Sequence, residues 1–143
     1  MLNIQKIKTA AVKTSNSLKQ ALPVLLGMIL LIGLMTVFIP KNFYNRVFTN
    51  NTILDPLIGA VFGSIVAGNP LTSYIIGGEL NAQGVGMIAI TAFILSWVTV
   101  GLIQLPAESL MLGKKFAVTR NIVSFFMAII ISILTVMTLG VLK

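Results

Sequence analysis

Hydrophobic residues fill four long stretches of the chain, and polar residues gather mainly in the segments between them. These stretches cover residues 21–39, 56–80, 85–105 and 121–142. The first and last are apolar throughout and match the length of about 20 residues that crosses the ~30 Å hydrocarbon core of a bilayer. The stretch 85–105 is equally long but carries several polar residues. The pattern predicts an all-α integral membrane protein.

The second stretch contains helix start and stop signals in its middle. Asp55 followed by Pro56 is typical of an N-cap and a proline at the first helical position. Gly68, Asn69 and Pro70 repeat this pattern, with a stop followed by a new start. We therefore expect two short helices on either side of Gly68 to Pro70. Backbone interrupted at membrane depth is tolerated only where protein or a water-filled cavity covers it, which makes the interruption a candidate functional site.

Two topologies fit the interrupted stretch. Each half, 56–67 or 70–80, is about 17–18 Å long and too short to cross a bilayer alone. If 56–80 enters and leaves on one side, the chain has three transmembrane helices plus a re-entrant helical hairpin. If 56–80 is one kinked helix, the chain has four transmembrane helices.

The distribution of Lys and Arg favours the hairpin. In that topology seven basic residues share the side of the N-terminus, and three lie opposite: Lys6, Lys8, Lys13, Lys19, Lys114, Lys115 and Arg120 against Lys41, Arg46 and Lys143. Four spans would give an even division. Because basic residues concentrate in cytoplasmic loops, we expect a multi-pass protein of the cell (inner or plasma) membrane with a cytoplasmic N-terminus.

Composition supports a membrane location. Hydrophobic residues make up 57% of the chain, charged residues 9%, and the mean hydropathy is +1.01, whereas soluble domains carry roughly 25% charged residues. We expect residues 1–143 to form a single membrane domain in contact with lipid. Residues 1–20 form a basic segment that suits either an interfacial helix or a solvated tail. The net charge of +7 is spread over loops and termini, so we expect no nucleic-acid partner.

The chain lacks the side chains of most catalytic and metal sites. It has no Cys and no His, and only three acidic residues. Thiol nucleophiles, Ser/His/Asp triads, haem–His ligation and typical zinc sites are therefore excluded. We expect neither an enzyme nor a cofactor or metal.

Polar residues near the interruption are the candidates for a substrate pathway. They comprise Asn69, Pro70, Thr72, Ser73 and Tyr74 after the interruption, and Ser96, Trp97 and Thr99 in the next stretch. Structural roles remain open for several of them. Asn69 suits a helix cap, and Ser96 and Thr99 suit hydrogen bonds to their own helix. Trp97 lies beyond the middle of its stretch, where it either packs inside the protein or lines a cavity.

Glycines mark the expected helix contacts. Gly59 and Gly63 are four residues apart and line one face of the first half-helix, where small residues let another backbone approach closely. Gly68 at the interruption completes the candidate packing set.

The order of these features resembles a known family over about half of the chain. The segments concerned are Gly59-Ala-Val-Phe-Gly63, Gly68-Asn69-Pro70, Gly84, the region from Ser96-Trp97 to Pro106, and Leu112-Gly113-Lys114-Lys115. They are similar to the predicted permease family that includes the arsenical permeases, the DUF318 or ArsP-like group. Its members are about twice as long and contain two similar halves, so the resemblance implies that this chain works as a homodimer. Many carry a Cys-x-Cys-like element near the interruption, and its absence means that thiol-based metal handling is not implied.

Two functions remain open. The first is a small permease-like transporter subunit that acts as a homo-oligomer on an ion or small solute. Transporters commonly bind solutes near the midplane, at discontinuous helices. The second is a structural or accessory subunit of a larger membrane complex, which the glycine faces serve equally well. A small multidrug-type exporter is disfavoured because 21–39 contains no acidic residue.

Overall fold

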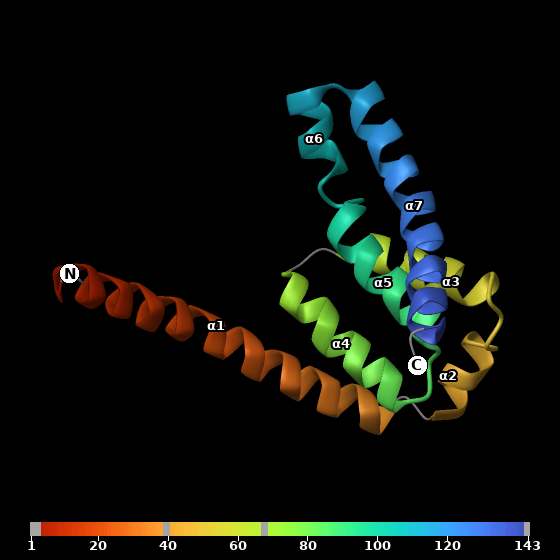
Figure 1. Cartoon of the computed structure of the whole chain (residues 1–143), viewed down its shortest axis with the longest axis horizontal. Coiled ribbons are helices and arrows are strands. Elements are labelled where there is room, and N and C mark those ends of the chain that lie inside the picture. The colour runs from red at the N-terminus through yellow and green to blue at the C-terminus, as the bar shows by residue number, and fades with distance from the viewer. Residues whose placement is uncertain (1–3, 39–40, 67–68, 142–143) are drawn as a thin grey trace. The chain divides into compact units, whose positions relative to one another are not determined.

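The computed structural model of the chain describes residues 4–38, 41–66 and 69–141, and every regular element in these ranges is an α-helix (Figure 1). The helices are α1 (Ile4–Phe38), α2 (Lys41–Val47), α3 (Leu54–Ile65), α4 (Pro70–Ala82), α5 (Met87–Thr99), α6 (Leu105–Leu112) and α7 (Lys114–Val141). The chain divides into two units, Met1–Ile39 and Pro40–Lys143. The all-α prediction is confirmed for the described residues.

The first unit contains the single helix α1. Its 35 residues run without a break through the predicted basic segment 1–20 and the predicted span 21–39. Pro23 lies inside this helix, where a proline removes one backbone hydrogen bond. The length is about 52 Å at 1.5 Å per residue, which exceeds the thickness of a hydrocarbon core.

In the second unit, α5 is the central helix and packs against α3, α4 and α7. Helix α3 also contacts α7, and α6 packs on α7. Buried residues on α5 include Ala89, Ala92, Phe93, Ser96 and Trp97. The core of the second unit therefore lies along α5, and the candidate site lies at the ends of this helix.

Glycines bring the backbones of α3 and α5 together. A Cβ atom added at Gly59 would lie 2.2 Å from the carbonyl oxygen of Ala89, and one added at Gly63 would lie 2.3 Å from that of Phe93. No real side chain fits at such distances. Because residue numbers increase together in these two contacts, α3 and α5 run in the same direction. In the structure, Gly59 and Gly63 lie against the backbone of α5, within the chain.

Helix α4 follows α3 in the sequence and carries the chain back, so that α5 can run in the same direction as α3. The turn after α4 includes Gly84 with φ +90°, a left-handed conformation that glycine adopts without strain. Gly77 of α4 faces Ile90 and Ile94 of α5, whose side-chain carbons would lie 3.0–3.1 Å from an added Cβ. The contact between α4 and α5 therefore also depends on a glycine, which has no side chain.

The last helix packs through small residues and exposes large ones. Its buried positions are Ala117, Asn121, Ala128 and Ser132, which follow one helix face. Among the described residues, α7 is the one helix long and apolar enough to cross a membrane, and 11% of its most apolar window is buried. A core helix of a soluble protein would instead be mostly buried. The other apolar helices found are the shorter α3 and α5.

The structure interrupts the predicted span 85–105. Helix α5 ends at Thr99, residues 100–104 are not regular helix, and α6 begins at Leu105. The 13 residues of α5 measure about 20 Å, which is too short to cross a bilayer. The segment 106–120, expected as a loop, instead forms α6 and the first turns of α7, so α7 begins seven residues before the predicted span 121–142.

The expected division of 56–80 into two helices is confirmed, with shifted boundaries. Helix α3 begins at Leu54, so Asp55 lies in its first turn and is not its N-cap. The amide oxygen of Asn51 instead accepts hydrogen bonds from the backbone N–H groups of Ile53 and Leu54, at 2.9 and 3.2 Å. Asp55 accepts a hydrogen bond from the backbone N–H of Thr49 at 3.1 Å.

We predict that Gly63→Ala destabilises the second unit by about 1–3 kcal/mol, the usual cost of overpacking a close contact. The added methyl group meets the backbone carbonyl of Phe93, which cannot rotate away. Gly78→Ala is the matched control, because a Cβ there meets nothing within 4 Å. Alanine favours a helix over glycine by about 1 kcal/mol, so this control should be neutral or stabilising. Unfolding of the detergent-solubilised chain, followed by circular dichroism, compares the two, and equal stabilities would contradict the packing described.

Candidate functional site

The predicted residues after the first interruption lie in the first turns of α4. Asn69 is the N-cap of this helix, and its side-chain oxygen accepts a hydrogen bond from the backbone N–H of Leu71 at 3.0 Å. Pro70 occupies the first helical position. Asn69 therefore performs the structural role expected of a cap residue, and both residues are exposed.

The three polar residues that follow Pro70 do not share one environment. Ser73 is fully buried, and its hydroxyl donates to the carbonyl of Pro70 at 2.7 Å. Thr72 is half-buried, whereas Tyr74 is 61% exposed. None of the five predicted residues between Asn69 and Tyr74 lines the cavity at the end of α3 or the smaller cavity at its start. Gly68 lies outside the described residues.

The predicted residues on α5 divide in the same way. Thr99 is exposed, and its hydroxyl donates to the carbonyl of Leu95 at 2.7 Å, the expected bond within its own helix. Trp97 packs inside the protein: it is 7% exposed and meets Phe93 edge to face, with ring centroids 5.4 Å apart. Ser96 is fully buried, and a Cβ added at Gly63 of α3 would lie 3.1 Å from its Cβ.

Ser96 differs from the other buried serines in its hydrogen bonding. The hydroxyls of Ser64, Ser73 and Ser132 each donate to a carbonyl three residues earlier, at 2.7–2.8 Å. The hydroxyl of Ser96 has no partner among the described residues, and neither does the indole N–H of Trp97. Buried polar atoms are nearly always hydrogen-bonded in native proteins. These two neighbouring side chains therefore retain unused capacity to bind a ligand or water.

The second interruption follows directly after these residues and contacts the last turn of α3. The backbone N–H of Leu102 donates to the carbonyl of Ser64, near the end of α3, at 3.4 Å. The backbone N–H of Gly101 donates to the side-chain oxygen of Asn121 on α7 at 2.9 Å. In an α-helix each N–H group donates to the carbonyl four residues earlier, and neither of these two does. Their other partners explain why α5 stops here inside an apolar stretch. Pro106 then falls in the first turn of α6, where proline is well tolerated.

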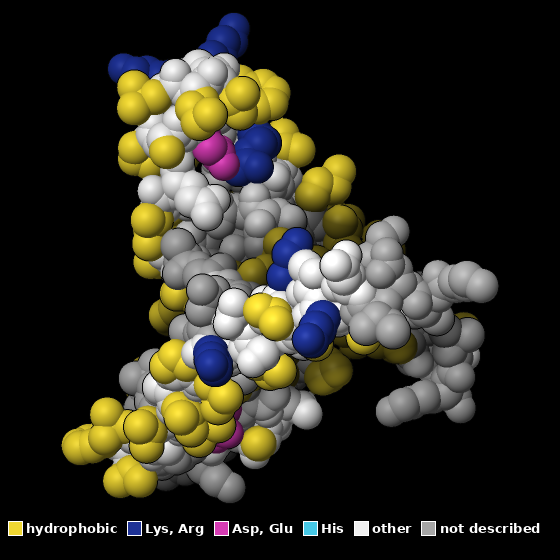
Figure 2. Space-filling model, turned by 90° about the vertical axis from the view of Figure 1, so that its left-hand side faces the viewer, with side chains coloured by type: hydrophobic (Ala, Val, Ile, Leu, Met, Phe, Trp, Pro, Cys, Tyr) yellow, Lys and Arg dark blue, Asp and Glu magenta, His cyan; other side chains and the backbone are white. Residues whose placement is uncertain are grey.

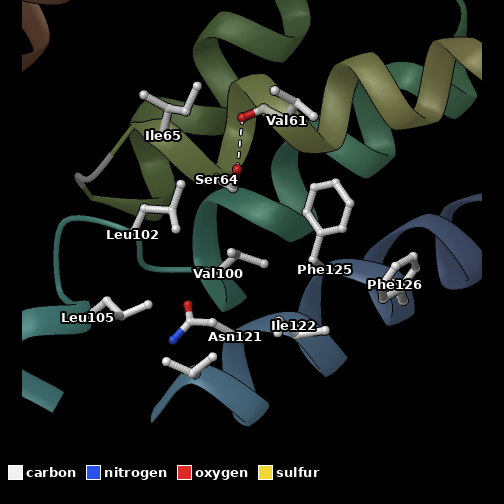
Figure 3. A pocket seen from close by; sticks show the side chains of 11 residues that line it. Val61, Ser64, Ile65, Val100, Leu102, Leu105, Asn121, Ile122, Phe125 and Phe126 are labelled. Atoms are coloured by element: carbon white, nitrogen blue, oxygen red, sulfur yellow. Dashed lines mark hydrogen bonds between the residues drawn. The ribbon is translucent and has the colours of Figure 1, made fainter. Parts of the chain in front are cut away.

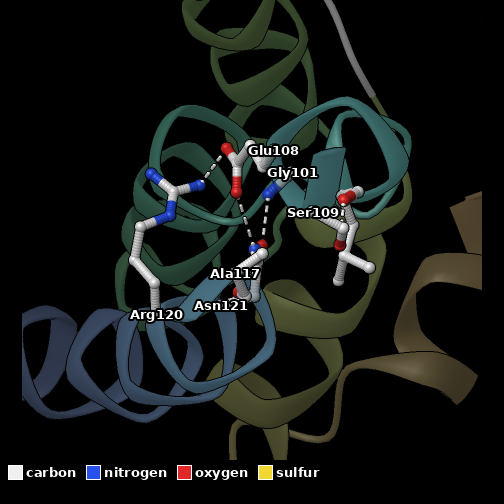
Figure 4. A network of polar contacts seen from close by, with 7 residues as sticks. Gly101, Glu108, Ser109, Ala117, Arg120 and Asn121 are labelled. Atoms are coloured by element: carbon white, nitrogen blue, oxygen red, sulfur yellow. Dashed lines mark hydrogen bonds and ion pairs between the residues drawn. The ribbon is translucent and has the colours of Figure 1, made fainter. Parts of the chain in front are cut away.

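Asn121 is the centre of a polar network that joins the segment after α5 to α6 and α7 (Figure 4). It is 4% exposed, and its amide group donates to the carbonyl of Ala117 at 2.9 Å and to the carboxylate of Glu108 at 3.2 Å. The other carboxylate oxygen of Glu108 pairs with Arg120. Asn121 thus bonds to groups on all three elements, and the charge of Glu108 is matched.

A cavity of about 500 Å³ lies beside the two interruptions (Figure 3). Its walls come from the end of α3, the segment after α5 and one face of α7. The side chains are mostly apolar, and Ser64 and Asn121 are the polar ones: Val61, Ser64, Ile65, Val100, Leu102, Leu105, Val118, Asn121, Ile122, Phe125 and Phe126. The cavity therefore adjoins backbone that is not helical.

The parallel arrangement of α3 and α5 gives this end of the unit a defined electrostatic character. Both helices end here, so the partial negative charges of two C-termini fall close together. Neither helix has a basic residue in its last turn. The last carbonyls of a helix have no donor within that helix, and here one of them, that of Ser64, is used by Leu102. A solute that donates hydrogen bonds would find acceptors at this end.

A smaller cavity, of about 210 Å³, lies near the start of α3 and contains polar residues that the sequence analysis did not select. Asp55, which is 3% exposed, lines it together with Asn50, Asn51 and Thr52. Its carboxylate lies in the first turn of α3, where the positive end of the helix stabilises a negative charge. This arrangement explains the burial of Asp55 without a ligand.

The sequence contains signals for the residues that were missed. Gly101 followed by Pro106 repeats, inside an apolar stretch, the combination of glycine and proline that marks the first interruption. Asn121 lies at the boundary of the last apolar stretch, where the hydrophobic pattern alone predicts the start of a span. The network itself depends on the fold of α6 against α7, which periodicity alone does not predict.

No family of known proteins, no curated protein and no solved structure matches this chain. The resemblance to the ArsP-like permeases therefore stays a prediction.

We predict that Asn121→Leu destabilises the chain by about 1–3 kcal/mol, because the part-buried N–H of Gly101 and the carboxylate of Glu108 each lose a partner. Amide hydrogen exchange at Gly101 and Leu102 should become faster. Thr135→Val is the control on the same helix, because the hydroxyl of Thr135 donates to its own helix at Ile131. It should change stability by less than about 0.5 kcal/mol. Unchanged exchange in Asn121→Leu would show that the network does not hold the interruption.

Proposed function

We propose that this chain is a permease-like membrane transporter subunit, working as a homo-oligomer, whose solute path passes between the two helix interruptions. The observation that carries the proposal is the hydrogen bond from Leu102 to Ser64, which joins the second interruption to the last turn of α3, just before the first interruption, beside a cavity. Non-helical backbone within a bilayer is otherwise costly, because each unpaired N–H or C=O group lacks water to bond with.

The depth of the interruptions along α7 supports this proposal. Asn121 lies seven residues after Lys114, which corresponds to about 10 Å along the helix. With the lysines at the membrane surface, the network of Asn121, Glu108 and Arg120 would lie within the hydrocarbon region. Ionisable groups at this depth are rare, and they commonly mark ion or substrate pathways.

The nature of the cavity narrows the class of solute. Its walls are mostly apolar, and two helix C-termini supply acceptors at one end, so the best ligand is a small solute with an apolar body and hydrogen-bond donors. The unpaired hydroxyl of Ser96 and indole N–H of Trp97 lie close to the same end of α5, but both residues are buried and neither lines the cavity, so their contact with the solute stays a prediction. A strong anion does not fit, because it would meet the negative ends of α3 and α5.

Under this proposal the sequence-predicted pathway gains two residues and loses three. Ser96 and Trp97 keep a place in it, with Ser64 and Asn121 added. Asn69 and Pro70 serve the start of α4, and Thr99 bonds to its own helix. Solute contact by Thr72, Ser73 and Tyr74 stays a prediction.

Cysteine accessibility tests the proposal without knowledge of the solute, and the chain has no native Cys. Ser64→Cys places a thiol in the cavity wall. A charged, membrane-impermeant thiol reagent should modify it in vesicles, at least about tenfold faster than either control. Phe62→Cys is the lipid-facing control, at a position 52% exposed on α3 outside the cavity wall, and Ser132→Cys is the packed control, at a fully buried position. A rate for Ser64→Cys equal to that of the Ser132→Cys control would refute a water-filled path here.

An accessory subunit of a larger complex is the second candidate function. The close packing of Gly59 and Gly63 within the chain favours this role, because helix contact alone accounts for the two glycines and no solute path is required. Purification from membranes separates the two functions. We expect a stable homo-oligomer by light scattering in detergent. A strictly monomeric chain, or one that always co-purifies with another protein, would favour the accessory role.

A further inference from the structure

The corner between α6 and α7 combines exposed apolar side chains with unpaired lysines. Helix α6 has no buried residue, and its last three residues, Leu110, Met111 and Leu112, are 88%, 84% and 59% exposed. Phe116, on the first turn of α7, is 56% exposed. Figure 2 shows basic side chains projecting from this end of the unit, beyond a group of hydrophobic side chains.

The backbone forces these groups to the tip of the unit. Gly113 has φ +90°, which allows the chain to reverse between the end of α6 and the start of α7. Lys114 and Lys115 follow at once, and both are exposed. The tip therefore carries three consecutive apolar side chains on one side of the turn and two ammonium groups on the other.

The charge at the tip is not compensated within the described residues nearby. Glu108, the one acidic residue of α6, pairs with Arg120 and accepts a hydrogen bond from Asn121, both further along α7. The first turn of α7 contains no acidic residue. Two lysines there oppose the positive end of the helix dipole, so they do not serve the stability of α7 itself.

We infer that the α6–α7 corner is a binding surface for anionic phospholipid headgroups. Leu110, Met111 and Leu112 enter the upper acyl region, while Lys114 and Lys115 contact the phosphates. Lysines of this kind bury their aliphatic stems along apolar surface and hold the charge at the headgroups. Charge complementarity selects an anionic leaflet, because each lysine near such a surface improves binding by about fivefold. The inference requires that the chain lies in a membrane, but it does not depend on what the chain transports.

A fluorescent probe at the corner tests this inference. Met111→Cys gives the full-length chain a single thiol for an environment-sensitive dye. In detergent, the labelled chain is titrated with short-chain phosphatidylglycerol, short-chain phosphatidylcholine or inorganic phosphate. We expect a blue shift in emission at a concentration of phosphatidylglycerol about 25-fold lower than that of phosphatidylcholine, from two lysines at about fivefold each. Inorganic phosphate should produce no shift.

Two double variants in the same labelled background complete the test. Lys114→Gln/Lys115→Gln should remove the preference for phosphatidylglycerol, whereas Lys114→Arg/Lys115→Arg should keep it. Lys8→Gln/Lys13→Gln, with the same loss of charge on exposed positions of α1, should leave the probe response unchanged. The inference is overturned by an equal response to both lipids, by a response to inorganic phosphate, or by a preference that survives the glutamine pair at the corner. Accessibility of Ser64→Cys is measured separately, so either proposal can fail alone.

Discussion

The backbones of α3 and α5 approach each other closely because Gly59 and Gly63 carry no side chain, and the other contacts of the second unit build on this pair. The same principle recurs at Gly77 of α4 and at the small buried residues of α7. Helices that pack in a membrane gain little from hydrophobic burial against lipid, and close contact through small residues is a major source of their attraction. Under the proposal that this chain lies in a membrane, the large apolar side chains exposed on the same helices would face lipid.

The second interruption remains stable because its free backbone groups bond to α3 and α7. Leu102 donates to the carbonyl of Ser64 in the last turn of α3, and Gly101 donates to the side chain of Asn121 on α7. Glu108 and Arg120 add a matched charge pair to the network. Polar groups of this kind are costly in an apolar environment unless nearly all of them are paired. Three buried side-chain atoms of the described residues lack a partner: the hydroxyl of Ser96, the indole N–H of Trp97 and Nε of Arg120. Ser96 and Trp97 are neighbours on α5, next to the second interruption.

Short sequence motifs predicted the features that depend on neighbouring residues alone, such as helix ends, caps and packing faces. Gly68 to Pro70 marked the end of one helix and the start of another, and Asn69 caps the second as its amide side chain favours. The spacing of Gly59 and Gly63 predicted a packing face. The interruption after Thr99 was not predicted, because it depends on acceptors at Ser64 and Asn121, which are distant in sequence. The separation of the candidate residues had the same cause, since only the tertiary arrangement decides whether Tyr74 and Ser96 share a surface.

The parallel direction of α3 and α5 has an energetic consequence of its own. Neighbouring helices that point the same way align their dipoles side by side, and like ends repel. Antiparallel neighbours such as α4 and α5 have the opposite, favourable arrangement. The contacts at Gly59 and Gly63 thus hold together a pair that electrostatics would separate. The C-terminal ends of that pair lie next to the cavity, so a positive group entering there would relieve the repulsion and tighten the two helices around itself.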